Sequence, residues 1–280
     1  MASVEITRTT ALYPTAVFIQ WDITRDEDGE HTVDIYRSGS PAGPWQVVAS
    51  ALVDAYHVLD DKFNLPPPPN QNDRHIGVNQ LSLSRDIYYY VAVTPPSGAA
   101  NRFQSAPMAV EPGLDRRTRL FKRKILRDES TAFRRLNGVP IAALKRRHWG
   151  KICRECYDEV NREATREHCP FCFGTSFETG YWAPVYIRGR KSPAPVQTQI
   201  SAHGESEIKV VTFTLLDYPH LEKKDLLVDL RRNDRYEIQM VVPTELKGVT
   251  VHQAVTASLI SRSSVEYKVL VDPANVPPLY

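Results

Sequence analysis

The sequence predicts a mainly β, multidomain protein with a helical centre. Apolar and polar residues alternate through residues 1–108 and again through residues 183–280, which is typical of strands in antiparallel sheets. The stretch between these regions is strongly basic and shows helical periodicity in its first part. All four cysteines of the 280-residue chain lie in this central stretch, as two Cys-x-x-Cys pairs.

These shifts in composition divide the chain into four expected segments. They are a β-sandwich in residues 1–108, a basic segment of α-helices in 109–150, a zinc-binding cysteine segment in 151–182 and a small antiparallel β-barrel in 183–280. A chain of this length is long for one hydrophobic core, so several domains are expected. The composition, 42% hydrophobic and 24% charged, is ordinary for a soluble globular protein.

The first segment is expected to form a sandwich of about seven strands. Residues 16–23 and 31–38 read as strands, and Asp28-Gly29 between them is typical of a hairpin turn. A longer strand is expected at 86–94, where prolines follow. The run PPPPNQND at 66–73 is too rich in proline for a central strand and is expected to form an exposed loop.

Several aromatic positions give this segment a family resemblance. The supporting residues are Trp21 in an early strand, Tyr36-Arg37 before a Gly/Pro turn, Trp45 after it, and a late strand with Tyr88, Tyr90 and Ala92 on one face and Tyr89, Val91 and Val93 on the other. With these features the first 100 or so residues resemble a fibronectin type III domain. The resemblance implies an interaction module or spacer and no chemistry of its own.

The second segment begins after a linker at 107–113 and is expected to be helical. Asp115 is a predicted N-cap, and Asn137-Gly138 predicts the end of the helix. A shorter helix is expected over residues 141–149. The apolar residues of the first helix are Leu120, Phe121, Ile125, Leu126, Phe133 and Leu136, and spacings of four and seven place much of this set on one helical stripe.

The same segment concentrates positive charge. Thirteen Lys or Arg and three Asp or Glu lie between residues 115 and 151, in a chain whose net charge is only +2. This asymmetry favours contact with a polyanion, either DNA phosphates or an acidic partner surface. A solvated helix face, or ion pairs within an oligomer, is the alternative. The candidate contacts are Arg116, Arg117, Arg119, Lys122, Arg123, Lys124, Arg127, Arg134, Arg135, Lys145, Arg146 and Arg147.

The cysteines have the spacing of a metal site, with two Cys-x-x-Cys pairs that are separated by twelve residues. Each pair can direct two thiolates at one centre, so Cys153, Cys156, Cys169 and Cys172 complete a tetrahedral shell for a structural Zn²⁺, as in a zinc ribbon. Four protein ligands leave no position for water, so catalysis by this metal is not expected. In the second pair, Gly174 is expected to adopt a positive φ that lets backbone amides face sulfur.

Other readings of the cysteines remain open. The CPFC pair alone resembles a redox motif, and two disulfides would form in an oxidising compartment. His148 and His168 flank the cluster and could replace a cysteine as ligand. The start of the chain lacks a signal-peptide pattern, and no apolar run approaches the roughly 20 residues of a membrane span. We therefore expect a reducing cytosol, which favours metal over disulfides, and no membrane span.

The fourth segment is expected to form a barrel of about six antiparallel strands. The strand candidates are residues 181–188, 208–216, 225–230, 235–243, 251–261 and 267–272. Alternation predicts a core that contains Val210, Phe213, Leu227, Ile238 and Val251.

Part of this segment carries a second resemblance. The residues are Asp225-Leu226-Leu227-Val228, Arg235-Tyr236-Glu237-Ile238, the run from Pro243 to Gly248, and the Gln253 strand that leads to Tyr267. They resemble the small β-barrel proteins at the neck of tailed bacteriophages, the head-closure or head–tail connector class. The cysteine pair that precedes FGTSFETGYW is similar to phage connector proteins with a zinc knuckle. Simple closure proteins lack the basic helices and the N-terminal sandwich.

The resemblance implies a virion structural protein that is assembled in the host cytoplasm and located in the neck or tail. It would form a homo-oligomeric ring between portal or adaptor and tail or tail-terminator proteins, near the passing genomic DNA. The alternatives are another tail or baseplate component, or a nucleic-acid-binding protein that uses a zinc ribbon. We do not expect an enzyme, because the sequence contains no catalytic set that we recognise.

Overall fold

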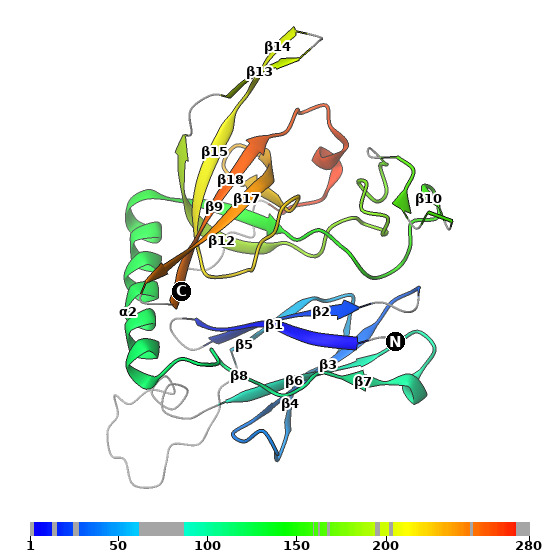
Figure 1. The fold of residues 1–280 in the computed structure, drawn as a ribbon, viewed down its shortest axis with the longest axis vertical. Helices are drawn as coiled ribbons and strands as arrows, with labels where there is room; N and C mark the ends of the chain where they lie inside the picture. The colour runs from blue at the N-terminus through cyan, green and yellow to red at the C-terminus, as the bar shows by residue number, and fades with distance from the viewer. Residues whose placement is uncertain are drawn as a thin grey trace. The chain divides into compact units, whose positions relative to one another are not determined.

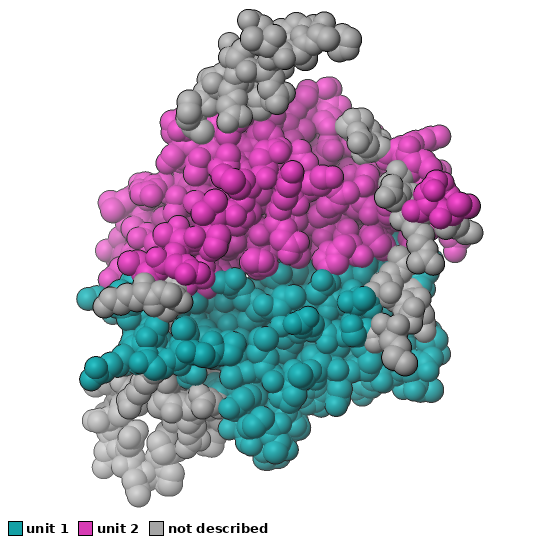
Figure 2. All heavy atoms as spheres, in the orientation of Figure 1, with its two compact units in different colours: residues 1–127, 149–151 teal, residues 128–148, 152–280 magenta. Residues whose placement is uncertain are grey.

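The computed structural model describes residues 3–12, 16–24, 28–61, 87–158, 160–161, 163–166, 169–193, 197–201, 204–246 and 249–272 (Figure 1). Strands make up most of the regular structure, and this part of the chain contains one α-helix, so the mainly β class is confirmed. The chain divides into two compact units (Figure 2), residues 1–127 with 149–151, and residues 128–148 with 152–280. The predicted loop at 66–73 lies outside the described residues.

The first unit contains two antiparallel sheets. One has the order β1-β2-β5, and the other has the order β4-β3-β6-β7, with β8 also paired to β6. The first sheet consists of β1 (Ser3–Leu12), β2 (Ala16–Thr24) and β5 (His57–Asp60). The second consists of β3 (Thr32–Ser38), β4 (Gln46–Val53), β6 (Tyr88–Thr94), β7 (Phe103–Gln104) and β8 (Met108–Ala109), with a 3₁₀ turn η1 (Ala99–Asn101) before β7.

The hairpin predicted at Asp28-Gly29 is wrong, because β2 and β3 belong to different sheets. Both edges of β2 are already paired, with β1 on one side and β5 on the other, so no edge remains for β3. The expected alternation of β6 is confirmed in part. Tyr89, Val91 and Val93 are fully buried, and Tyr90 on the other face stacks on Tyr36 with ring centroids 4.6 Å apart.

A buried polar group joins the two sheets of this unit. Asp60 of β5 is 1% exposed and accepts hydrogen bonds from Arg37 of β3 and from the hydroxyl of Tyr89 of β6, both at 2.8 Å. A carboxylate at this depth requires such partners, because burying an unpaired charge is costly. The three side chains therefore connect the sheets in addition to the apolar core.

Helix α2 (Arg116–Ala132) starts as predicted. The Thr118 backbone N–H donates to the Asp115 carboxylate at 2.7 Å, which is the geometry of an N-cap. A π-helical turn η2 (Phe133–Asn137) ends at the predicted Asn137-Gly138 stop, where the chain becomes strand β9. Glycine is required at 138, because an added Cβ would lie 1.8 Å from the Phe133 carbonyl oxygen.

The predicted apolar stripe of the helix is partly wrong. Leu126 and Phe133 are buried, but the exposed fractions of Leu120, Phe121 and Leu136 are 48%, 39% and 83%. The inner face of the helix instead includes Lys122, whose ammonium pairs with Glu111 at 3.0 Å while both side chains are almost fully buried. The face of the helix that is buried therefore differs from the one that the apolar spacing predicts.

The second unit contains the predicted barrel, a closed antiparallel sheet with the order β12-β15-β18-β17-β16-β9. Its strands are β9 (Gly138–Leu144), β12 (Val185–Pro193), β15 (Val210–Leu216), β16 (Leu226–Asp229), β17 (Asp234–Leu246) and β18 (Val249–Leu259). All six strands contribute to one buried cluster that includes the predicted core residues Phe213, Leu227 and Ile238. Val210 and Val251 are also buried.

Two strand or helix predictions in this unit are wrong. The helix expected over 141–149 is replaced by β9 as the sixth barrel strand. The strand expected at 267–272 is also not formed, since the 3₁₀ turn η3 (Val265–Lys268) overlaps its start and irregular chain follows. In β9, Ile141 faces the barrel interior while Ala142 and Leu144 belong to a second cluster outside it. A run of apolar residues that is buried on both faces lacks the alternation of a half-exposed strand, so periodicity does not distinguish it from a buried helix.

A further hairpin, β13 (Gln197–Ser201) and β14 (Gly204–Ile208), follows β12 and precedes β15. The cysteine segment adds the short pair β10 (Tyr157–Asp158) and β11 (Glu163–Ala164). Within the described residues, no helix is long and apolar enough to cross a lipid bilayer.

Candidate metal centre

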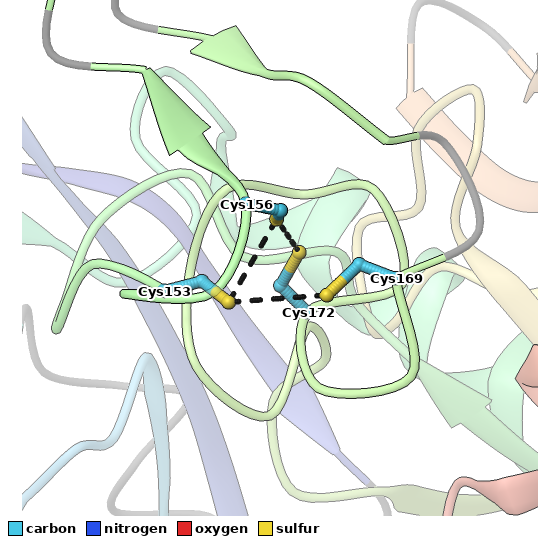
Figure 3. A group of neighbouring side chains, drawn as sticks. All are labelled: Cys153, Cys156, Cys169 and Cys172. Carbon is cyan, nitrogen blue, oxygen red and sulfur yellow. Dashed lines mark hydrogen bonds between the residues drawn. The ribbon is translucent and has the colours of Figure 1, made fainter.

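The four cysteines lie together and are all buried, with their sulfur atoms within 4.8 Å of one another (Figure 3). The Cys156 sulfur lies 3.1 Å from that of Cys172 and 3.8 Å from that of Cys153, and the Cys153 and Cys169 sulfurs are 4.0 Å apart. Bonds of about 2.3 Å to a tetrahedral metal would place sulfurs about 3.8 Å apart. The cysteines are free thiols and could hold one metal ion.

The two Cys-x-x-Cys turns have the same backbone geometry at their first cysteine. The carbonyl of Cys153 accepts a hydrogen bond from the Tyr157 N–H at 3.2 Å, and the carbonyl of Cys169 accepts one from the Phe173 N–H at 2.8 Å. In each turn, the N–H two residues after the first cysteine also bonds to its sulfur. Both turns therefore point backbone dipoles at sulfur, which stabilises the thiolate form that a metal requires.

The second cysteine of each turn is also held in the same way, by a threonine. Thr175 donates its N–H and its hydroxyl to the Cys172 carbonyl, at 2.9 and 2.7 Å. Thr165 does the same to the Cys156 carbonyl, at 2.8 and 3.0 Å. Sequence reasoning missed this symmetry because the two threonines are three and nine residues from their cysteines, so no repeat of fixed spacing exists.

The thiols differ in acidity. Burial raises the pKa of Cys153. Burial, together with the hydrogen bonds that the Cys156 thiol donates to neighbouring sulfurs, raises the pKa of Cys156. Burial acts in the same direction on Cys169, but hydrogen bonds from the backbone N–H groups of Phe171 and Cys172 and from the thiols of Cys156 and Cys172 together outweigh it and lower its pKa to about 7. A cation at the centre of the four sulfurs would favour the thiolate of each of them.

Glycines allow the chain to close around the second pair. Gly174 has a φ of 74°, which confirms the predicted positive φ. Gly180 has a φ of 65°, and a Cβ there would lie 2.6 Å from the Cys172 carbonyl oxygen. Both positions have a left-handed backbone, and Gly180 also packs tightly against Cys172, so a larger residue would be strained at either position.

The cysteine segment is bound to the chain that follows β9. Arg146 donates its guanidinium to the Gly174 carbonyl at 2.6 Å, and the Arg147 N–H donates to the Gly180 carbonyl at 3.0 Å. The Arg147 guanidinium also lies 4.1 Å from the centre of the Trp182 ring, in cation–π geometry. Basic side chains thus attach the cysteine segment to the barrel.

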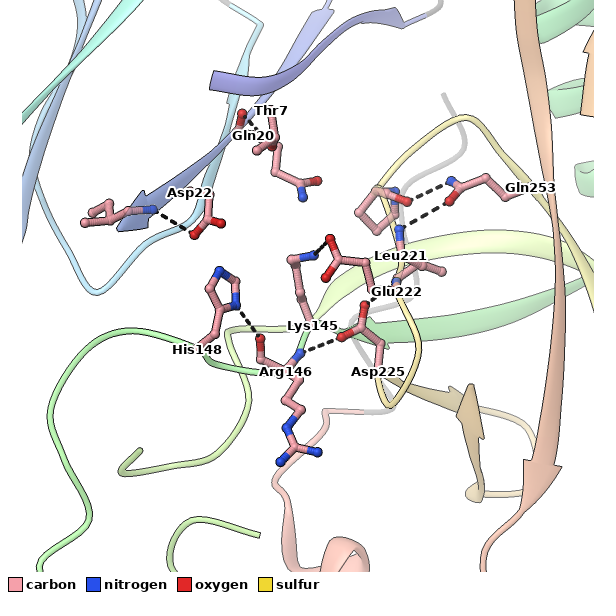
Figure 4. A network of polar contacts seen from close by, with 12 residues as sticks. Thr7, Gln20, Asp22, Lys145, Arg146, His148, Leu221, Glu222, Asp225 and Gln253 are labelled. Carbon is pink, nitrogen blue, oxygen red and sulfur yellow. Dashed lines mark hydrogen bonds and ion pairs between the residues drawn. The ribbon is translucent and has the colours of Figure 1, made fainter. Parts of the chain in front are cut away.

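A polar network continues from these residues into the barrel (Figure 4). The Asp225 carboxylate accepts hydrogen bonds from the backbone N–H groups of Arg146 and Glu222, both at 2.8 Å. The Lys145 ammonium pairs with the Glu222 carboxylate at 3.0 Å. Burial raises the pKa of Asp225 to about 6, against the opposing effects of Lys145 and the two N–H donors.

The structure separates the twelve candidate polyanion contacts into groups. Lys122, Lys145 and Arg147 are buried in internal contacts, and Arg146 is partly buried beside Gly174. A buried cation with an internal partner is not available to a polyanion at the surface. Arg119, Arg123 and Arg134 are half-buried, and the side chain of Arg116 lies outside the described residues. The exposed candidates are Arg117, Lys124, Arg127 and Arg135.

The two flanking histidines are not among the clustered ligands that the structure describes. His148 is exposed, and its Nδ1 lies 3.4 Å from the Arg146 carbonyl oxygen. His168 lies outside the described residues. The site is therefore defined by its four cysteines.

Comparison with known proteins adds no relative. No protein-family model matches the sequence, and no curated protein matches it.

Proposed function

We propose that the four cysteines hold one structural Zn²⁺. Four thiolates that lie within 4.8 Å of one another favour zinc among the common divalent metals. The site is buried and leaves no open position for a substrate, so the metal would contribute folding free energy and no reaction. Copurification of one zinc ion per chain, measured by elemental analysis, tests this assignment. Cobalt substitution provides a second test, because tetrahedral Co²⁺–thiolate sites have characteristic visible absorption.

We further propose that the chain is a structural protein of a tailed-phage particle, a ring-forming connector at the neck between portal or adaptor and tail. The observation that carries the proposal is the closed barrel. The residues that resemble head-closure proteins, from Asp225 to Tyr267, form strands β16 to β18 and the turn η3 of this barrel. A small closed barrel is the fold that the resemblance implies.

The first unit fits the proposal as a spacer or attachment module. Its sheet orders, β1-β2-β5 and β4-β3-β6-β7, support the fibronectin type III assignment. They correspond to a seven-strand sandwich in which the fourth strand pairs with the third instead of extending the first sheet. Such a domain on an assembly protein would bind an outer component or separate two layers.

The second candidate is a zinc-dependent nucleic-acid-binding protein. It is favoured by the exposed cations Arg117, Lys124, Arg127 and Arg135. It is weakened by the burial of Lys122, Lys145 and Arg147, which removes three of the twelve charges from the surface. A purified protein that binds duplex DNA with a steep salt dependence would favour this candidate.

Native mass spectrometry of the purified chain, with and without a chelator, tests the main proposal because it counts metal ions and subunits together. We expect one zinc per chain, and either a ring of defined size or a monomer that forms a ring when a portal complex is added. A zinc-bound monomer that ignores portal complexes and binds DNA would replace the connector proposal with the nucleic-acid candidate.

A further inference from the structure

Two contacts hold the first turns of helix α2. Asp115 caps the N-terminus through the Thr118 N–H, and Lys122 forms its buried ion pair with Glu111. Glu111 is itself held to strand β1, since its N–H donates to the Thr9 hydroxyl at 3.3 Å. With Lys122 and Leu126 turned inward, the opposite side of the helix is presented to solvent.

The exposed side forms a continuous stripe of mixed character. It consists of residues at spacings of three and four, which share one face of a helix. Leu120 and Phe121 lie in its middle, with 48% and 39% of their surfaces exposed. Cations precede and follow them. The stripe, which we call the α2 stripe, consists of Arg117, Leu120, Phe121, Lys124 and Arg127, all exposed, and the exposed carboxylate of Asp128 lies beside it on the same face.

We propose that the α2 stripe is a docking surface for an acidic protein segment that also carries apolar side chains. Arg117 and Lys124 would pair with carboxylates, while Leu120 and Phe121 would enter an apolar contact at the centre. Phe and Arg are enriched at the buried centres of protein interfaces, and a polar rim around an apolar centre is their usual arrangement. The choice of a protein partner rests on the proposed function as an assembly protein.

Charge and the pattern of apolar residues favour an acidic protein segment over a nucleic acid or an anionic membrane surface. A nucleic-acid backbone would neutralise the cations, but its phosphates offer no apolar surface to Leu120 and Phe121. A membrane-surface helix needs a broad apolar face that is free to enter the lipid. In helix α2, the other apolar face, which includes Leu126, is already buried in the protein and is not free to enter lipid.

The test measures binding of the full-length, zinc-loaded protein to four probes. They are a random copolymer of glutamate and tyrosine, a glutamate homopolymer, a duplex DNA of about three helical turns, and vesicles of phosphatidylcholine with phosphatidylserine. At about 0.15 M salt, where exposed charges are screened beyond about 8 Å, we expect the copolymer to bind tightest. Fluorescence anisotropy or sedimentation would provide the dissociation constants.

Two variants separate the two halves of the stripe. Leu120→Ser with Phe121→Ser should weaken copolymer binding about tenfold and leave homopolymer binding nearly unchanged. Arg117→Glu with Lys124→Glu should weaken binding to both polymers. The matched controls are Val47→Ser, which replaces an exposed apolar residue on β4, and Arg190→Glu, which reverses an exposed cation on β12; neither should change binding.

Copolymer binding that survives Leu120→Ser with Phe121→Ser would overturn the inference. So would tighter binding to DNA or to vesicles than to the copolymer. Native mass spectrometry of the same variants keeps the two proposals distinguishable. Loss of copolymer binding with intact rings supports the α2 stripe independently, whereas rings that never form in any variant would argue against the connector function alone.

Discussion

Different forces stabilise the N-terminal sandwich and the cysteine segment. The sandwich buries large side chains such as Phe18, Ile19 and Trp21 almost completely. Between residues 152 and 180, the buried apolar residues that the structure describes are the four cysteines. Area burial can therefore stabilise the first region without any ligand, whereas the second depends on what the four sulfurs bind. The comparison predicts that each region can be disrupted while the other stays folded.

Metal removal should have the largest effect. Chelation, or Cys172→Ser, should unfold the cysteine segment, because structural zinc contributes about 10 kcal/mol or more of apparent folding free energy in small zinc domains. Hydrogen exchange followed by mass spectrometry should show loss of protection at 152–182 and at the Arg146 and Arg147 contacts, with strands β1 to β6 still protected.

A matched control for this experiment is Ser176→Ala, which changes a hydroxyl in the same segment and leaves all four sulfurs in place. It should keep one metal per chain. If Cys172→Ser lowered the metal content to zero without changing the exchange pattern or the melting profile, the metal would have no structural role.

The converse experiment disrupts the sandwich by cavity formation. Trp21 is 1% exposed, so Trp21→Ala should reduce the free energy of unfolding of the first unit by about 3 to 5 kcal/mol. Metal stoichiometry and protection in the cysteine segment should not change. Loss of zinc in this variant would show that the two regions fold as one cooperative unit and would end the contrast between them.

The same two regions show which features sequence could reveal. The clustering of the four cysteines, the Asp115 cap and the stop at Gly138 depend on residues close together in the chain, so local spacing predicted them. Burial of Lys122 and Lys145 depends on Glu111 and Glu222, and the pairing of Lys145 with Glu222 crosses 77 positions of the chain, 222 minus 145. No local sequence pattern indicates such a pairing, so the sequence predicted that all of these cations are exposed.

Strand β9 was missed for a related reason. Its residues Ile141 to Leu144 are covered on one side by the barrel core and on the other by a cluster that includes Tyr181. β9 is buried on both faces only when it takes its place in the closed barrel. The sequence predicted six barrel strands, which is the correct number, but it placed one of them at 267–272 instead of at β9.

An intermediate effect is expected at the network between the cysteine segment and the barrel. The pKa of Asp225 rises from its ordinary 3.8 to about 6, so the folded state binds this proton more tightly than the unfolded state does. The stabilisation that this tighter proton binding adds to the free energy of unfolding is therefore fully present below pH about 4. It decreases as pH rises toward 6 and is lost above pH 6. A shift of about two units corresponds to about 3 kcal/mol at most.

The variant Asp225→Asn removes this titration. Urea unfolding at several pH values should show that the variant loses more stability relative to the wild type at pH 4 than at pH 7. Glu245→Gln, at an exposed carboxylate of β17, is the control and should follow the wild-type profile. Parallel profiles for Asp225→Asn and the wild type would mean that Asp225 does not titrate in this range.

The smallest effect sharpens the account of the sandwich itself. Tyr89→Phe removes the hydroxyl that donates to Asp60 and leaves Arg37 as the remaining partner of that carboxylate. A single hydrogen bond to a charged acceptor is worth about 1.5 to 3 kcal/mol, and the ring itself stays in place, so we expect a loss of unfolding free energy near the low end of this range.

Asp60→Asn on the Tyr89→Phe background tests whether Tyr89 and Asp60 act as a unit. If the two losses add within about 0.5 kcal/mol, the residues act separately, whereas a clearly smaller combined loss means that Tyr89 and Asp60 stabilise the sheet contact through each other. That second result would place part of the stability of the sandwich in a polar group. The two regions would then differ mainly in the group at their centre, which is a carboxylate in the sandwich and a cluster of four thiols in the cysteine segment.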